Sequence, residues 1–93
     1  MKPVLITTKH RGVFFGHLEK DPENLPGSVD LVGARGCISW SSDVKGFLGL
    51  ASTGPSSDCR IGPKVEEITL YDVTAVVTCS KVAVAKWEEA PWR

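Results

Sequence analysis

The segment Gly12-Val-Phe-Phe-Gly-His-Leu-Glu19 decides the fold that we predict for this chain. Its apolar residues favour a β-strand, and Gly16 at its centre lets a strand bend sharply. Strand-like segments precede it at residues 3–8 and follow it at residues 28–35. Three successive strands with a bent middle one are typical of the start of a small β-barrel.

The connections around these strands are rich in turn-forming residues. We predict a tight turn at residues 9–12 and a longer loop at residues 21–27, where two prolines would interrupt a ladder of strand hydrogen bonds. Gly33 and Gly36 flank Arg35 and predict a bulge or corner there. A fourth strand at residues 37–41 would follow that corner.

The middle of the chain changes to a helical period. Residues 42–51 are predicted to form a short helix with Ser41 or Ser42 as its N-cap, and its buried face would carry Val44, Phe47, Leu48 and Ala51. Its two glycines each cost about 1 kcal/mol relative to alanine, so the helix needs packing against the rest of the protein. A polar loop is expected at residues 52–58.

The last third is predicted to hold two strands and a helix. Residues 65–71 and 72–79 are rich in β-branched residues and would be joined at or near Tyr71-Asp72. A final helix at residues 80–89 would begin at Ser80, and Trp87 would anchor it on the barrel.

These elements predict one mainly β domain over residues 1–93, a β-rich α+β fold. Its length of 93 residues, with 42% hydrophobic and 24% charged residues, is ordinary for a single globular domain. The order of elements resembles the SH3-like and Sm-like small barrels, with two short helices added. We expect the core to contain Val4, Leu5 or Ile6, Phe14, Leu31, Ile68, Leu70, Val73 and Val77.

Charge and cysteine content limit the classes of function. The chain has 11 basic and 11 acidic residues, so it lacks the net positive charge that non-specific nucleic-acid binding requires. Its apolar runs are too short to span a bilayer, and no apolar signal core follows Met1. Three cysteines without a Cys-x-x-Cys motif are expected to be reduced and buried. We therefore expect a cytoplasmic protein.

Catalytic motifs are missing from the sequence. His10 and His17 are its only histidines, and neither a nucleophile elbow nor a metal-ligand spacing accompanies them. The sequence therefore predicts no enzyme and no cofactor or metal.

A set of residues between about positions 4 and 79 carries a resemblance to known proteins: Gly12-Val-Phe-Phe-Gly16 with Leu18, Ala34-Arg35 with Trp40-Ser41, Leu48 with Leu50-Ala51 and Gly54, Cys59, Glu67-Ile68 with Leu70, and Val77 with Cys79. In these residues the chain is similar to a family of uncharacterised small proteins encoded by tailed phages and prophages. The resemblance implies a viral protein in the cytoplasm of a host cell, and it brings no known activity.

Within that context two binding functions stay open. One is an inhibitor that docks on a host defence protein through exposed aromatics such as Trp40 and Trp92. The other is an oligomeric sponge that sequesters a nucleotide signal, with basic and hydroxyl groups on the phosphate and Trp40 on the base. A small-barrel nucleic-acid module ranks third, and burial of Trp40 in the barrel core is the structural alternative. The predicted binding surface comprises Arg35, Trp40, Ser41, Lys45, Ser56, Ser57 and Arg60.

Overall fold

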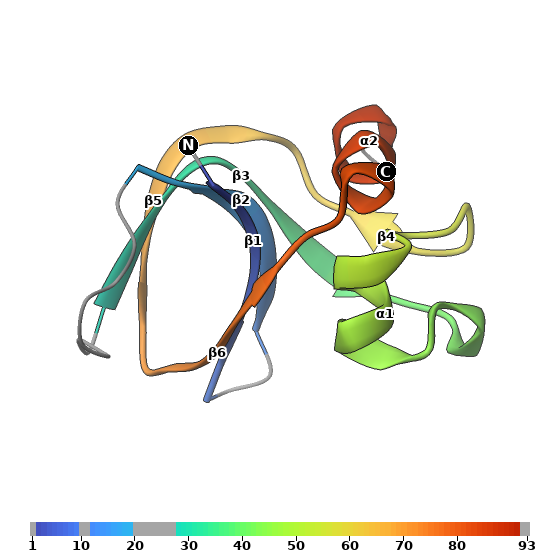
Figure 1. Cartoon of the computed structure of the whole chain (residues 1–93), viewed down its shortest axis with the longest axis horizontal. Coiled ribbons are helices and arrows are strands. Elements are labelled where there is room, and N and C mark those ends of the chain that lie inside the picture. Colours follow the sequence, from blue (N-terminus) through green and yellow to red (C-terminus); the bar gives the residue numbers. More distant parts are fainter. Residues whose placement is uncertain (1, 10–11, 20–27, 92–93) are drawn as a thin grey trace.

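The computed structural model describes residues 2–9, 12–19 and 28–91 (Figure 1). The elements in chain order are β1 (Lys2–Thr8), β2 (Val13–Leu18), β3 (Ser28–Ser39), the 3₁₀ helix η1 (Ser42–Val44), α1 (Gly46–Ser52), β4 (Arg60–Ile61), β5 (Val65–Tyr71), β6 (Val73–Thr78) and α2 (Lys81–Glu89). The fold is mainly β with two short α-helices, which confirms the predicted fold class. The predicted loop at residues 21–27 and part of the turn at residues 9–12 lie outside the described residues.

All strand pairs of the sheet are antiparallel. The pairing order is β4-β3-β2-β1-β6, and β5 pairs with the first half of β3. Asp72 alone joins β5 to β6, with a φ of 54°. Because these two consecutive strands lie at opposite ends of the order β5-β3-β2-β1-β6, the sheet has to curve round on itself, as Figure 1 shows. The two closing strands and their junction are confirmed.

A bulge in β3 produces part of this curvature. Phe15 pairs with Arg35 and His17 pairs with Val32, so one residue of β2 faces two residues of β3. Gly33 within this step has a φ of 60°, a conformation that favours glycine. The predicted bulge is confirmed, but β3 continues without a break to Ser39. The prediction of a separate strand at residues 37–41 is therefore wrong, because β3 bends at the bulge and does not end there.

Alternation along the strands builds two hydrophobic clusters. The cluster formed by strands alone contains Val4, Ile6, Leu18, Val29, Leu31, Ala34 and Leu70. The second cluster joins Leu5, Val13 and Phe15 of the sheet to Leu50, Ala83 and Trp87 of the helices. Figure 1 shows both helices on one side of the curved sheet. Of the predicted core, Val4, Leu5, Ile6, Leu31 and Leu70 are buried, whereas Phe14, Ile68, Val73 and Val77 are partly buried.

The first helix differs from its prediction. Lys45 and Gly46 have φ values of 62° and 77°, so the segment divides into η1 and α1. This interruption changes the direction in which the side chains of α1 point relative to those of η1. As a result Leu50 is buried, although Phe47 and Leu48 were the residues predicted to be buried there. Phe47 and Leu48 are exposed, which corrects their assignment to the core.

The carbonyl groups at the end of α1 all have partners. The Gly49 carbonyl accepts from the Thr53 N–H at 2.8 Å, and the Leu50 carbonyl accepts from the indole N–H of Trp87 at 3.0 Å. Ser80 donates to the carbonyls of the last two helical residues. Its backbone N–H donates to the Ala51 carbonyl at 3.0 Å, and its hydroxyl donates to the Ser52 carbonyl at 2.6 Å. The same hydroxyl accepts from Ala83 at 3.1 Å, as an N-cap does. The predicted cap of α2 is confirmed, and it also joins the two helices.

Gly49 and Gly46 provide the first test of this packing. Helix propensity alone makes Gly→Ala favourable by about 1 kcal/mol in either position. A Cβ at Gly49, however, would collide with the Val44 carbonyl oxygen, whereas a Cβ at Gly46 would have no neighbour within 4 Å. We expect Gly49→Ala to lower the free energy of unfolding by about 3 kcal/mol or more through overpacking.

Gly46→Ala serves as the matched variant in urea denaturation. An alanine at position 46 would have to adopt the positive φ of Gly46, which should lower the free energy of unfolding by only about 1–2 kcal/mol. Equal stability of the two variants would contradict the described approach of α1 to η1.

Candidate functional site

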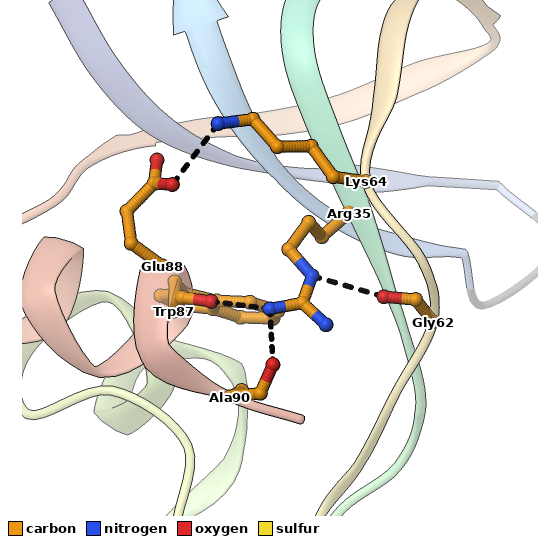
Figure 2. A network of polar contacts seen from close by, with 6 residues as sticks. All are labelled: Arg35, Gly62, Lys64, Trp87, Glu88 and Ala90. Carbon is orange, nitrogen blue, oxygen red and sulfur yellow. Dashed lines mark hydrogen bonds and ion pairs between the residues drawn. The ribbon is translucent and has the colours of Figure 1, made fainter. Parts of the chain in front are cut away.

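Arg35 of β3 is directed into the protein. Its side chain is 6% exposed, its Nε donates to the Gly62 carbonyl at 2.9 Å, and its Nη1 donates to the carbonyls of Trp87 at 2.8 Å and Ala90 at 2.5 Å (Figure 2). The last two carbonyls belong to the end of α2 and the residue after it, where a helix exposes acceptors and partial negative charge. The guanidinium thus joins the sheet to α2, and its predicted phosphate-binding role does not fit this position.

Figure 2 also shows an ion pair beside this network. The Lys64 ammonium lies 3.1 Å from the Glu88 carboxylate. Both side chains reach solvent, so the pair adds little stability compared with the buried hydrogen bonds of Arg35.

Truncation of Arg35 and truncation of Arg60 to alanine are expected to change the free energy of unfolding by very different amounts. Arg35→Ala leaves three carbonyls without their charged donor, which should lower the free energy of unfolding by roughly 3 kcal/mol or more. Arg60 is exposed in β4, so Arg60→Ala should change it by about 0.5 kcal/mol or less. Urea denaturation measures both. A fully stable Arg35→Ala variant would show that these hydrogen bonds are dispensable.

Two of the predicted serines meet around an acidic residue. The hydroxyls of Ser41 and Ser56 lie 3.2 Å apart, and both donate to Oδ1 of Asp43, the Ser56 bond being 3.3 Å long. These bonds, that of Ser41 first, lower the pKa of the exposed Asp43 carboxyl below its ordinary value. A carboxylate at the centre of this cluster repels a phosphate, so the hydroxyls do not form the expected anion site.

The pKa of Asp43 tests the cluster. Because the folded-state pKa is lowered, the stabilising effect of the carboxylate is present at neutral pH and is lost as the pH falls through that value. Ser41→Ala removes the larger cause and should raise the pKa of Asp43 towards its ordinary value. NMR titration of the carboxyl carbon measures the change, and Ser42→Ala is the control. An unchanged pKa in Ser41→Ala would mean that this bond does not form in solution.

The other polar residues of the predicted surface are dispersed. Lys45, Ser57 and Arg60 are exposed, and within the described part of the chain no hydrogen bond or ion pair joins them to Asp43. Ser56 and Ser57 line a pocket of about 180 Å³ that also includes Lys86 and Glu89. This small pocket presents opposite charges, which does not favour an anionic ligand.

Trp40 and Phe47 line a larger cleft, of about 640 Å³. Their side chains are 39% and 36% exposed, so Trp40 is not a core tryptophan. The strand residues of the cleft include Val13, Thr7 and Ala75, which pair directly across β2, β1 and β6. This row continues the sheet face that carries Leu5 and Phe15 beneath the helices. The cleft therefore lies at the end of that face, where Phe47 of α1 forms part of its lining.

The chemistry of the cleft is neutral. Its described lining residues carry no charge, and its two threonines at positions 7 and 74 share a hydroxyl hydrogen bond of 2.7 Å. Two partly exposed aromatic rings beside Val13, Ala75 and a pair of mutually hydrogen-bonded threonines suit a neutral apolar side chain. The predicted binding surface includes Trp40 but not Phe47, because helical periodicity assigned Phe47 to the core. Trp92 and His10 lie outside the described residues.

The cysteines do not extend this site. Cys59 and Cys79 are buried, as expected, and Cys37 is partly buried. Burial, and to a smaller extent the nearby Cys59, raises the pKa of the Cys37 thiol to about 12. Burial raises the pKa of the Cys79 thiol to about 11. Both thiols are therefore protonated and weakly nucleophilic at neutral pH. Among residues 2–9, 12–19 and 28–91, no group of three acidic, histidine or cysteine side chains is placed to hold a metal ion.

Comparison with protein families gives a match over most of the chain. A model described as a domain of unknown function, DUF6948, matches residues 1–87. The chain belongs to this family. Comparisons with curated proteins and with solved structures find no significant match. In the described part of the chain, no helix has both the length and the apolar character needed to cross a membrane. Family membership brings no activity, so the function has to be argued from the cleft.

Proposed function

We propose that this DUF6948 protein is a non-enzymatic binding protein that acts stoichiometrically on a partner protein. The observation that carries the proposal is the neutral cleft between Trp40 and Phe47. Tryptophan is among the residues that most often dominate the energy of protein interfaces. An apolar side chain of the partner would enter the cleft and bury both rings.

The polar geometry supports a protein partner over a nucleotide. A sponge would need cations and free hydroxyls around a phosphate. Arg35 instead donates to backbone carbonyls, and Ser41 and Ser56 donate to Asp43. A nucleic-acid module would also gain little general attraction from a chain of zero net charge.

The resemblance to small tailed-phage proteins supports a more specific partner. A phage protein that binds without turnover gains an advantage by blocking a host defence protein in the host cytoplasm. A small barrel of the SH3-like or Sm-like kind would suit this role, since a rigid scaffold holds the exposed rings in place. We therefore propose inhibition of a host defence system as the biological function.

Substitutions in the cleft test the proposal. Trp40→Ala and Phe47→Ala should each weaken binding to a partner captured from host cells at least about tenfold, because hot-spot truncations cost about 2 kcal/mol or more. Val82→Ala is the matched control, since Val82 is an apolar side chain that is 60% exposed on α2. Surface plasmon resonance measures the affinities, and phage plating on a defence-positive host measures the phenotype.

The same assays identify the competing function. Loss of phenotype in Lys45→Ala and Arg60→Ala but not in Phe47→Ala, with a nucleotide released from the denatured protein, would replace this proposal by the sponge. A phenotype that persists when the chain is present at far less than one copy per target would indicate turnover and contradict stoichiometric binding.

A further inference from the structure

One edge of β6 has no strand partner among the described residues, where β6 pairs with β1 alone. The Cys79 N–H donates to the Pro3 carbonyl at 3.0 Å, which marks one hydrogen-bonded position of the β1–β6 ladder. In an antiparallel pair such positions alternate, so Val77 and Ala75 also bond to β1. The backbone N–H and C=O groups of Val76 and Thr78 therefore point to the outer edge.

Apart from a bulge at Thr74, where the β1–β6 register shifts, this edge carries few of the features that usually prevent pairing with other chains. Natural edge strands carry charged residues or proline, or are covered by another element. The sequence of β6, Val73-Thr-Ala-Val-Val-Thr78, has neither a charge nor a proline. By contrast, β5 contains Glu66 and Glu67. The outer edge of β6 is thus the sheet edge best suited to accept another strand.

The edge is also continuous with the cleft. Val13, Thr7 and Ala75 form one row across three strands, and Ala75 ends that row on β6. A strand added beside β6 would put its own residue next in the row, at the open side of the cleft. Its residue beside Ala75 would adjoin the cleft that Trp40 and Phe47 also line.

From these two observations we infer that the partner presents an extended segment that pairs with the outer edge of β6 and places an apolar side chain in the Trp40–Phe47 cleft. This inference rests on the proposed function and specifies how the partner is bound. Main-chain hydrogen bonds to Val76 and Thr78 supply affinity without regard to sequence, and the cleft selects the apolar residue.

Thr78 permits a selective test because it is exposed and its N–H points away from β1. Thr78→Pro removes that outward donor and keeps the β1–β6 hydrogen bonds, since proline is tolerated on an edge whose N–H faces solvent. Thr78→Val keeps the N–H and loses only the hydroxyl. The probe is a 12-residue peptide selected on the full chain from a random displayed library, with affinities measured by calorimetry.

We expect selected peptides to carry a large apolar residue and to lose binding in Trp40→Ala. Thr78→Pro should weaken them at least about tenfold, and Thr78→Val should bind them as the unaltered chain does. Methylating the peptide nitrogens one at a time should abolish binding at every second residue within the paired stretch, and this scan needs no altered protein if Thr78→Pro proves unstable.

Other results overturn the inference. Peptides that depend on Trp40 but tolerate Thr78→Pro and methylation at every nitrogen would exclude strand pairing and leave the proposed function in place. A chain that forms a dimer, dissociated by Thr78→Pro in light scattering, would show that the edge binds a second copy. A selection without Trp40-dependent peptides contradicts strand capture, and the affinity for the captured host partner then decides the proposed function separately.

Discussion

Trp87 is the residue on which both helices depend. Its indole stacks on Phe15 with ring centres 5.3 Å apart, its N–H donates to the last turn of α1, and its own carbonyl accepts from Arg35. The side chain is completely buried, so each polar group has to find a partner inside the protein. Sheet, α1 and α2 therefore take one mutual arrangement, in which the hydrogen bonds of Trp87 and Arg35 are made together.

This arrangement also positions the cleft at the margin of the helices. α1 packs against β1 and β6 and α2 packs against α1, and together they cover the sheet around Leu5 and Phe15. The row through Thr7 lies one step farther along the same face, where Val13 is still buried in the helix cluster and Phe47 of α1 lines the cleft. The buried hydrogen bonds of Trp87 join α1, α2 and β3 and so help to set the position of α1 beside the cleft.

Local patterns predicted the elements well, but contacts across the chain decided the site. Strand alternation, the bulge at Gly33 and the cap at Ser80 depend on neighbouring residues, which a sequence displays directly. Arg35 looks like a free cation in the sequence because its partners are backbone carbonyls between 27 and 55 residues away. Phe47 was misplaced because the left-handed residues Lys45 and Gly46 interrupt the helical period, and a helical pattern assumes no such break.

The size of the cleft limits what it can contribute to binding. Burial of one large apolar side chain is worth about 1.5–3 kcal/mol. A dissociation constant of 1 μM corresponds to about 8 kcal/mol after the cost of association has been offset. The cleft alone is therefore too weak to hold a partner at micromolar concentration, and the neutral chain offers little long-range attraction. In the proposed binding mode further contacts would add to the cleft, and the outer backbone groups of β6, which adjoin the cleft at Ala75, would supply main-chain hydrogen bonds.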